Sequence, residues 1–421
     1  MTQIKEILNE ANPWWKGAFK AEYKERAIYK EIERFLDSRL IIALTGLRRV
    51  GKTTILLKIV EDKIKEGFDP SSIIFFPFDE QNDIDIRDII KEYEKLFGKS
   101  ISPGKHILIL DEIQKLAGWE NKLKWIYDLY SKDMKILISG SESLFIRKRS
   151  KEALAGRLFE FKVTTLSFKE FVAFKGQKVR PIGLYDKELD MLLEKFVHCQ
   201  GFPELVGRDD KDYIKRYITD GIVEKAIYRD IPGIFNVRDT ASLNSILRIL
   251  MEEPGQLIEN QKLAKELKIS RYSVSLYLRY LEDSFLVRKL YNYSRNARKS
   301  ERTLRKYYPA VISSELAFRD DDIYKSRVFE WLIVSQLDAN YFWRDQYNNE
   351  VDVVSAEGPT PIEVKYGRID EKGLLSFMDK FSVTQGYIIS SEVEEERKMG
   401  KNTIKIVPAR RFLLEDGTMP Q

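Results

Sequence analysis

Residues 40–60 read LIIALTGLRRVGKTTILLKIV, and this stretch decides the fold of the chain. The apolar run 40–44 is typical of a buried strand, and an apolar segment with helical spacing follows Thr53. Between them stands Gly46-x-x-x-x-Gly51-Lys52-Thr53, the spacing of a phosphate-binding loop. Strand, loop and helix in this order predict a nucleoside triphosphate site. A glycine-containing turn that matches by chance is the alternative.

The residue types in this loop suit the chemistry of phosphate binding. Gly46 and Gly51 let the backbone bend so that N–H groups point at phosphate oxygens, and the start of the helix adds positive potential. Lys52 is expected to reach the β- and γ-phosphates, and the Thr53 hydroxyl to bind Mg²⁺. The residues expected to contact the nucleotide are Gly46, Arg48, Arg49, Val50, Gly51, Lys52, Thr53 and Thr54.

Length and composition set outer limits. The chain has 421 residues, enough for two or three domains, and a formal net charge of +5 that permits a nucleic-acid partner without requiring one. One cysteine and two histidines exclude an intrachain disulfide and an ordinary zinc site, so a metal would bind oxygen ligands. Charged residues interrupt the N-terminal segment and the apolar runs. We therefore expect a cytoplasmic protein with no signal peptide and no membrane partner.

Further apolar runs at 72–78, 106–110 and 135–139 alternate with helical patterns. This alternation predicts a parallel sheet with its working residues at the carboxyl ends of the strands. Asp111 and Glu112 directly follow one of these runs. Asp111 is expected to hold Mg²⁺ together with Thr53, and Glu112 to orient or deprotonate the attacking water. A buried strand capped by turn-forming acids is the alternative.

Polar residues beyond the loop extend the candidate site. Ser139 and Ser141 stand at the end of the run 135–139 and are candidates for contact with the γ-phosphate or the attacking water, although a helix N-cap fits equally well. Arg157 is a candidate for a phosphate contact in its own or a neighbouring subunit, against the alternative of an exposed, ion-paired arginine. Action in a neighbour would require a homo-oligomer.

Several later motifs accompany the loop and the acidic pair: Ser139-Gly140-Ser141, Leu154-Ala155-Gly156-Arg157, Leu166-Ser167-Phe168-x-Glu170-Phe171, Gly201-Phe202-Pro203-Glu204 and Tyr228-Arg229-Asp230-Ile231. Together they resemble the archaeal and bacterial AAA-type ATPases, in which the ATPase is fused to a C-terminal domain resembling the PD-(D/E)xK nucleases. The resemblance implies ATP as the cofactor and a small helical lid after the ATPase core. The double glycine usual before Phe-Pro in this family is here Gln200-Gly201.

Residues 246–290 differ in character from the helical stretch before them. They read as a helix, a short helix at 260–267, a turn, a longer helix at 271–283 and an apolar strand at 285–290. This order is similar to winged-helix domains, which bind DNA or dock proteins. Ser270, Arg271, Tyr272 and Ser275 are expected near the start of the second helix, where phosphates or base edges are met.

A basic stretch with interleaved tyrosines follows the predicted winged helix, and this composition suits nucleic acid. We therefore expect DNA as a partner, and protein docking is the alternative. The basic residues are Arg288, Lys289, Arg295, Arg298, Lys299, Arg302, Arg305 and Lys306, and the tyrosines are Tyr291, Tyr293, Tyr307 and Tyr308.

A third candidate site lies near the C-terminus. If residues 357 and 358 form a two-residue hairpin turn, Asp352 faces Glu363 across the strand pair, and Lys365 shares a face with Glu363. Glu350 lies on the same face as Asp352 and is an alternative to it. The expected elements are a helix at 323–337 and strands at 341–344, 350–356 and 361–366.

Carboxylates that face each other repel unless a cation joins them, so this site predicts Mg²⁺ or Mn²⁺. The expected ligands are Asp352, Glu363 and, from the helix, Glu330, with Lys365 orienting a water. This is the Asp…Glu-x-Lys pattern of PD-(D/E)xK nucleases. A surface hairpin whose charges are merely solvated is the alternative.

The sequence thus predicts an α/β protein: a P-loop ATPase core with a parallel sheet at 1–165, a helical lid at 166–240, a winged-helix-like domain at 241–300 and a restriction-endonuclease-like α/β domain at 301–421. We expect ATP hydrolysis coupled to DNA processing, with metal-dependent cleavage by the C-terminal domain. The alternative is a nucleotide-controlled switch or scaffold that binds DNA or protein without cleaving it. The expected catalytic residues are Lys52, Glu112, Arg157, Asp352, Glu363 and Lys365.

Overall fold

The computed structural model describes residues 2–78, 84–102, 105–141, 154–179, 181–296, 298, 300, 304–337, 339–355 and 358–415. The chain divides into two compact units, Met1–Thr164 and Thr165–Gln421. The second unit contains the predicted lid, winged helix and nuclease-like domain, and the division of that unit at residues 240 and 300 stays a prediction.

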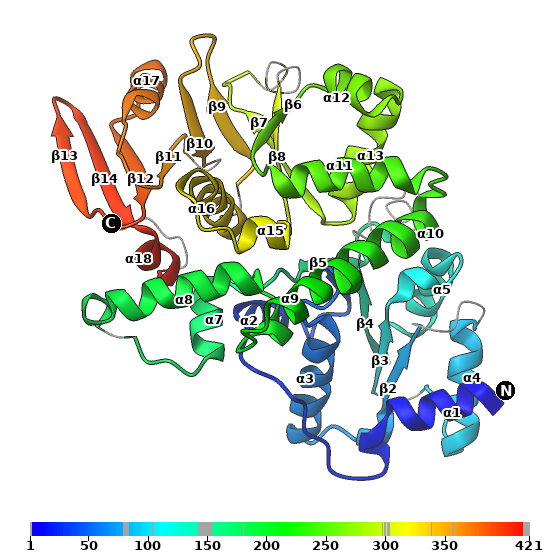
Figure 1. Ribbon diagram of the computed structural model, residues 1–421. Helices are drawn as coiled ribbons and strands as arrows, with labels where there is room; N and C mark the ends of the chain where they lie inside the picture. Colours follow the sequence, from blue (N-terminus) through cyan, green and yellow to red (C-terminus); the bar gives the residue numbers. More distant parts are fainter. Residues whose placement is uncertain are drawn as a thin grey trace. The chain divides into compact units, whose positions relative to one another are not determined.

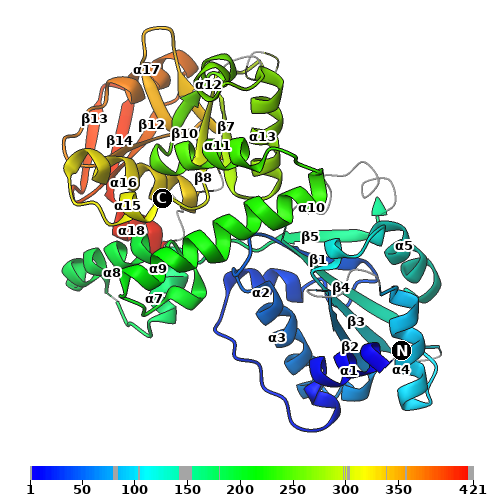
Figure 2. The same cartoon turned by 45° about the vertical axis from the view of Figure 1, so that its right-hand side comes forward.

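A five-stranded, all-parallel sheet forms the centre of the first unit, as the alternating pattern predicts (Figures 1 and 2). Its strand order is β2-β3-β4-β1-β5, so β4 lies between the strand that precedes the phosphate loop and the strand that ends in the acidic pair. The carboxyl ends of all five strands therefore meet at one edge. The strands are β1 (Ile41–Thr45), β2 (Ile73–Pro77), β3 (His106–Asp111), β4 (Met134–Gly140) and β5 (Leu158–Lys162).

Strand β5 was not predicted. It is the edge strand of the sheet and pairs with β1 in parallel, from Ile41 with Leu158 to Thr45 with Lys162. Its side chains are half-buried or exposed, so the strand lacks the continuous apolar run that marks β1 and β3.

Helices of the first unit pack on this sheet, and their apolar side chains build its core with those of the strands, for example Leu123 on α5 with Leu108 and Ile136. Burial of such side chains is the main term that holds the unit together. The helices are α1 (Thr2–Ala11), α2 (Ala27–Glu33), α3 (Lys52–Lys65), α4 (Ile86–Phe97) and α5 (Trp119–Tyr130).

The second unit opens with a helical segment, and the described residues between 165 and 255 contain no strand. Gln200 follows α8 in a left-handed conformation with φ +49. The AAA-type ATPases that the sequence resembles usually have glycine at this position. The Gln200 amide donates to Ile312 O at 3.1 Å and accepts from Ile312 N at 2.8 Å, which offsets the backbone strain. The helices are α7 (Phe168–Phe174), α8 (Asp186–Cys199), α9 (Lys211–Ile218) and α10 (Ile231–Phe235), with π-helical turns at Thr219–Glu224 and Ala226–Asp230.

A nine-stranded mixed sheet spans the rest of the second unit, in the order β13-β14-β12-β11-β10-β9-β7-β8-β6. Strands β7 and β9 pair in parallel and join the strands of the predicted winged helix to those of the predicted nuclease-like domain. One continuous sheet therefore crosses the predicted boundary at residue 300. The strands are β6 (Gln256–Ile258), β7 (Val287–Asn292), β8 (Arg305–Pro309), β9 (Tyr341–Arg344), β10 (Glu350–Val354), β11 (Pro361–Lys365), β12 (Gln385–Ser390), β13 (Glu395–Met399) and β14 (Asn402–Pro408).

Helices accompany this sheet (Figure 1), and α16 packs against β8, β10 and β11, while α17 packs against β10, β11 and β12. An apolar cluster of Trp343, Val351, Phe377 and neighbours fills the space under α17. The helices are α11 (Thr240–Glu252), α12 (Asn260–Leu267), α13 (Arg271–Asp283), α15 (Ser314–Ala317), α16 (Asp322–Gln336), α17 (Lys372–Phe381) and α18 (Ala409–Leu414).

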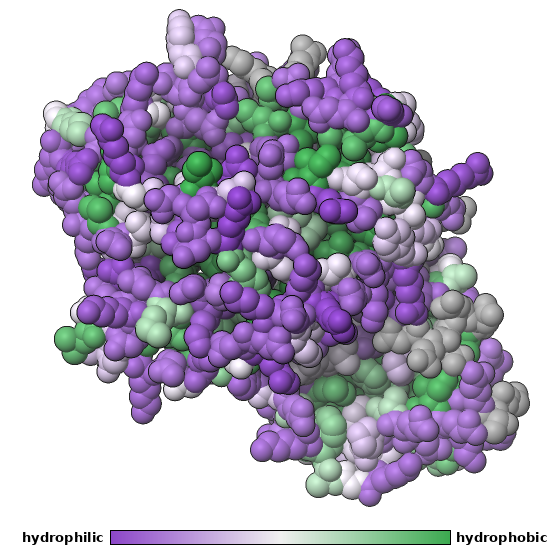
Figure 3. Space-filling model, viewed as in Figure 1, coloured by the Kyte–Doolittle hydropathy of each residue, from purple (hydrophilic) through white to green (hydrophobic). Residues whose placement is uncertain are grey.

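Hydrophilic side chains cover most of the face drawn in Figure 3, with smaller apolar areas between them. Among the residues that the structure describes, no helix combines the length and the apolar character needed to cross a membrane.

Candidate functional site

The phosphate loop connects β1 to α3 through two glycines in unusual backbone conformations. Gly46 has φ +145, and a Cβ atom on it would lie 2.0 Å from the carbonyl oxygen of Val163. Gly51 has φ +96 and directly precedes the first residue of α3. Side chains at either position would be strained, so the loop conformation depends on glycine.

Lys52 lies inside the loop rather than on its surface. Its side chain is 5% exposed, and its ammonium donates to Gly46 O at 3.0 Å and to Leu47 O at 2.9 Å. The same ammonium is 3.7 Å from Oε1 of Glu112. A cation at the loop and a carboxylate from another strand are thus brought together, and the roles predicted for Lys52 and Glu112 stay predictions.

Asp111 is the centre of the polar contacts beside the loop. It accepts a hydrogen bond from the Thr53 hydroxyl at 2.7 Å and another from the Ser139 hydroxyl. Burial raises the pKa of the Asp111 carboxyl, while the hydroxyl donors and Lys52 act in the opposite direction. The neighbouring oxygens of Thr53 and Asp111 are the donors that Mg²⁺ prefers, so these two residues fit the predicted ion.

Glu112 adopts a left-handed conformation with φ +54, which turns it away from the strand direction. Its backbone N–H donates to the Ser139 hydroxyl at 3.0 Å. Gln114 donates from Nε2 to Oε2 of Glu112 at 2.5 Å and to the Ser141 hydroxyl at 3.1 Å. Ser139 and Ser141 therefore both belong to the polar network around the acidic pair.

Two residues of this network were missed at the level of sequence. Gln114 follows the acidic pair by two positions, and that closeness is the signal that would have found it. Arg26 donates to Val50 O at 2.9 Å and to Thr164 O at 2.8 Å, so it holds the phosphate loop to the end of the first unit. No local pattern around Arg26 indicates this role, because both acceptors are backbone carbonyls far along the chain.

The third candidate site is a cluster of acidic residues in the second unit, Glu330, Glu350, Asp352 and Glu363, here called the carboxylate cluster. Strand β10 pairs with β11 through Val353 with Ile362 and Val354 with Pro361, which is the predicted register. Asp352 and Glu363 are therefore opposite each other, and Oδ2 of Asp352 accepts from Val364 N at 2.9 Å. Lys365 donates to Oε1 of Glu363 at 2.6 Å.

Lys306, from the unpredicted strand β8, lies in the middle of the carboxylate cluster. Its ammonium is 3.1 Å from Oε1 of Glu330, 2.5 Å from Oε1 of Glu350 and 3.3 Å from Oδ1 of Asp352. Burial by itself would lower the pKa of Lys306, but Glu330 and then Tyr308, Asp352 and Glu350 raise it well above its ordinary value. The amino group is thus held as a cation.

The residues of the carboxylate cluster do not fit the divalent metal that the sequence predicted. Both oxygens of Asp352 accept from Lys306 and Val364 N–H, which can only donate, whereas the hydroxyls that face Asp111 can rotate and offer an oxygen to an ion. Oε2 of Glu363 is buried without a partner, but a single oxygen does not make a site for Mg²⁺. Over the described residues, no group of three or more Asp, Glu, His or Cys could hold a metal.

Comparison with known families bears on the first site. Residues 38–172 match the sequence model of a family described as an AAA domain, and this range includes the phosphate loop, Asp111, Glu112 and Ser139. Residues 38–172 are thus similar to an AAA-type ATPase domain, and the first unit, which contains most of them, is here called the ATPase domain. ATP is therefore the ligand that the phosphate loop of this ATPase domain is built to bind. A second range, 192–310, matches a family described only as a domain of unknown function (DUF8612).

Relatives of the chain include two proteins of Methanocaldococcus jannaschii and one of Haemophilus influenzae, all described as uncharacterized. One archaeal protein is 29% identical over 82% of this chain and 78% of its own length. The other is 25% identical over 95% of this chain and 89% of its own length. The H. influenzae protein is 26% identical over 69% of this chain and 72% of its own length. The similarity to these relatives thus extends well beyond the ATPase domain.

Solved structures with some similarity include PCH-2 of C. elegans, with 14% identity, a TM-score of 0.26 and coverage of 67% of both chains. AMPPCP-bound DnaA from Aquifex aeolicus shows 16% identity, a TM-score of 0.28 and coverage of 61% of this chain and 86% of its own. Scores this low give no basis for transferring the properties of either protein.

Arg157 does not lie near the phosphate loop of its own ATPase domain. It directly precedes β5, and its carbonyl accepts from Ile41 N, at the start of β1, whereas the loop follows the end of β1. Its side chain pairs with Asp128 at 3.1 Å. The predicted contact within one subunit is therefore excluded by the length of the strand, and only action in a neighbouring subunit stays a prediction.

Most of the described basic residues that followed the predicted winged helix are engaged inside the second unit. Arg288 donates to Val334 O at 3.2 Å and also to Leu337 O, and Arg295 donates to Phe381 O at 2.7 Å. Lys289 pairs with Glu282 at 2.8 Å. This stretch therefore mainly stabilises the fold. Lys299 and Arg302 lie outside the described residues.

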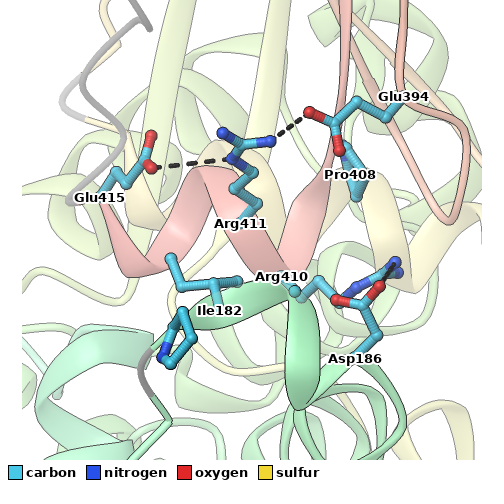
Figure 4. Close-up of a pocket in the computed structure, with 9 residues that line it drawn as sticks. Ile182, Asp186, Glu394, Pro408, Arg410, Arg411 and Glu415 are labelled. Atoms are coloured by element: carbon cyan, nitrogen blue, oxygen red, sulfur yellow. Dashed lines mark hydrogen bonds and ion pairs between the residues drawn. The ribbon is translucent and has the colours of Figure 1, made fainter.

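A hollow of about 420 Å³ in the second unit is shown in Figure 4. Arg410 pairs with Asp186 at 3.1 Å and with Asp190 at 3.3 Å. Arg411 pairs with Glu394 and lies 3.8 Å from Glu415. Each of the two arginines is balanced by carboxylates, so the hollow has the character of an ion-pair network that joins α8 to α18 and not of a ligand site.

Proposed function

We propose that this chain hydrolyses ATP in its ATPase domain and that the cycle controls DNA bound by the second unit. The observation that carries the first part is the convergence of Thr53, Ser139 and Glu112 on or beside the buried Asp111. The start of α3 and the ends of β3 and β4 supply these groups, and such an arrangement can bind Mg²⁺ and activate water at one edge of a sheet.

Each residue of the site has a proposed role. Thr53 and Asp111 would hold Mg²⁺, which offsets the negative charge of the phosphates when bound. Lys52 would stabilise the β- and γ-phosphates, and Glu112 would take a proton from the attacking water or orient it. Ser139 fixes Asp111, and Gln114 fixes the Glu112 carboxylate. The backbone of the loop would bind phosphate oxygens through Arg48, Arg49, Val50, Gly51 and Thr54.

The order of elements in the second unit supports DNA binding. Helix α11, strand β6, helices α12 and α13, and strands β7 and β8 follow one another, and the strands lie in the order β6-β8-β7. A winged helix has this sequence of elements, with α13 as its recognition helix. Ser270 caps α13 by accepting from Ser273 N at 2.9 Å, and Arg271 and Tyr272 are exposed in its first turn. These side chains suit phosphate and base contacts.

The experiment measures phosphate release by the full chain with and without duplex DNA at fixed salt concentration. We expect DNA to stimulate turnover severalfold, and the Arg271→Ala, Tyr272→Ala double variant to lose the stimulation while keeping the basal rate. Tyr347→Ala is the matched control, because Tyr347 is 75% exposed in the turn between β9 and β10, outside the proposed winged helix. Turnover that ignores DNA in the wild type would reject the DNA-dependent part of the proposal and leave the ATPase part intact.

A nucleotide-controlled switch or scaffold is the second candidate function, and the position of Lys306 favours it over metal-dependent cleavage. As a switch or scaffold, the chain would bind DNA or protein through its second unit and would cleave neither. Incubation of labelled linear, single-stranded and branched DNA with Mg²⁺ or Mn²⁺ separates the two. Cleavage that disappears in Asp352→Ala and Lys365→Ala would support the nuclease, and intact DNA throughout would support the switch.

A further inference from the structure

The carboxylate cluster has a cation of its own in Lys306. The side chain of Lys306 is 5% exposed, and its ammonium contacts one oxygen each of Glu330, Glu350 and Asp352. These acids come from α16 and β10, between 24 and 46 positions along the chain from Lys306. A buried charge needs partners of opposite sign, and here one ammonium serves three carboxylates.

We propose that the Lys306 ammonium takes the position of a divalent metal in the carboxylate cluster, so that the cluster binds neither Mg²⁺ nor Mn²⁺ and serves as a structural anchor within the second unit. This inference concerns the chemistry of the second unit and does not depend on ATP hydrolysis or on DNA binding.

Further contacts occupy most of the other oxygens of the carboxylate cluster, and Oε2 of Glu363 is buried without a partner. Tyr308 donates its hydroxyl to Oε1 of Glu330 at 2.6 Å, the same oxygen that faces Lys306. Arg344 pairs with Oε2 of Glu350 at 3.0 Å, so both oxygens of Glu350 contact cations. A divalent ion would have to displace these donors as well as Lys306. Mg²⁺ in proteins keeps several waters and binds through one or two carboxylates, so it would have to take at least one carboxylate from the cations that now contact it.

Strand β8 fixes the backbone of Lys306 beside the carboxylate cluster. The strand is hydrogen-bonded on both sides, with Leu290 of β7 and Leu257 of β6 opposite Lys306. Tyr308, two positions further along β8, contacts Glu330 as well. Gly255 closes the same region, because a Cβ atom on it would lie 2.9 Å from Oε1 of Glu330. Backbone pairing and close packing thus fix the strand, and the ion pairs hold the buried ammonium among the acids.

The anchor joins parts of the second unit that the sequence assigns to different elements. Lys306 and Tyr308 belong to β8, which pairs with the strands of the proposed winged helix, whereas Glu330, Glu350 and Asp352 belong to α16 and β10. The ion pairs therefore tie β8 to the C-terminal strands and to α16. A lysine does this without a metal, and it also removes the Lewis acid that phosphodiester cleavage at this cluster would require.

The test is Mn²⁺ binding followed by electron paramagnetic resonance in the nucleotide-free full chain. Every protein carries Asp111→Asn, which removes the carboxylate assigned to Mg²⁺ in the ATPase domain. We first compare two proteins that both keep Lys306, one with Asp352 and one with Asp352→Asn. We expect them to bind Mn²⁺ equally. We expect Lys306→Met, which exposes three carboxylates to one another, to gain a Mn²⁺ site and to rise in Tm when Mn²⁺ is added.

Lys289→Met is the matched control, because Lys289 lies on β7 and pairs with Glu282 instead of the carboxylate cluster. It should neither bind additional Mn²⁺ nor gain stability from it. If Lys306→Met does not fold, the proposal is tested by the other comparison alone, that of Mn²⁺ binding with Asp352 and with Asp352→Asn while Lys306 is present. Submillimolar Mn²⁺ binding with Lys306 present that is lost in Asp352→Asn would overturn the proposal. So would a folded Lys306→Met protein whose Mn²⁺ binding and Tm match those of the Lys289→Met control.

Discussion

The Thr53 hydroxyl donates to Oδ2 of Asp111 at 2.7 Å, although 58 positions separate the two residues in the chain. Thr53 lies in the first turn of the helix after β1, and Asp111 ends β3, with β4 between the two strands. The hydroxyl of Ser139, on that intervening strand, donates to the other oxygen of Asp111. The start of α3 and the end of β4 thus converge on the carboxylate that ends β3.

Replacement of Lys52 by alanine should abolish ATP turnover. Lys52 is the buried cation of the phosphate loop, and loss of a preorganised charge of this kind lowers catalytic rates by roughly 10²–10³-fold. The measurement is phosphate release, with thermal melting to check folding. Lys58→Ala is the control, because Lys58 lies on the same helix and pairs with Asp62 at 2.5 Å. Turnover retained in Lys52→Ala would contradict the site.

Replacement of Glu112 by glutamine should separate binding from hydrolysis. Glutamine keeps the shape of the side chain but cannot accept a proton, so we expect turnover to fall by about 10²–10⁴-fold. Affinity for a fluorescent ATP analogue should stay within about threefold, since Lys52 and the loop are unchanged. Glu66→Gln, at the exposed end of α3, serves as the control. Equal turnover in both variants would show that Glu112 is not the base.

Replacement of Gly46 by alanine should destabilise the ATPase domain far more than the same change at Gly67. Both glycines have positive φ, but only Gly46 would bring a Cβ atom to 2.0 Å from Val163 O, while Gly67 faces open space. We expect about 1 kcal/mol for Gly67→Ala, from backbone strain alone. Gly46→Ala should cost several times more, as measured by chemical denaturation. Similar losses at the two positions would contradict the close approach.

Replacement of Arg157 by alanine should leave turnover nearly unchanged wherever the protein is monomeric. Arg157 is at the start of β5, at the opposite end of the sheet from the loop, and pairs with a half-exposed Asp128. Such a surface pair contributes at most about 1 kcal/mol, so Asp128→Ala should lower Tm equally little. The measurement is turnover across a dilution series combined with light scattering. A large loss in the monomer would be inconsistent with this position.

Cys199 should resist thiol reagents until the second unit unfolds. It is 2% exposed, and burial raises its pKa to about 12, so the reactive thiolate is scarce at pH 8. Labelling of the native protein should be at least about 100-fold slower than in urea. Its rate should climb with pH up to the raised pKa, whereas the unfolded chain levels off above roughly pH 8.5. Rapid labelling of the native protein would contradict the burial.

Local patterns predicted the parts of the molecule that depend on near neighbours. Four of the five strands of the ATPase domain were predicted because each is a continuous apolar run. The register of β10 and β11 follows from a short turn and the alternation of side chains, and Val353 pairs with Ile362 as expected. The residues of β8 instead predicted contact with nucleic acid, from their basic and aromatic composition, but Tyr307 and Tyr308 are buried.

The sequence by itself determined the phosphate loop, the acidic pair after β3 and the facing positions of Asp352 and Glu363, because each rests on spacing within a few residues. Only the tertiary structure decided which cation meets the carboxylate cluster and which residues hold the loop. Lys306 and Arg26 reach partners through strand pairing and backbone carbonyls that lie from 24 to 138 positions away. No spacing rule reaches that far, because chain folding and not local periodicity brings such groups together.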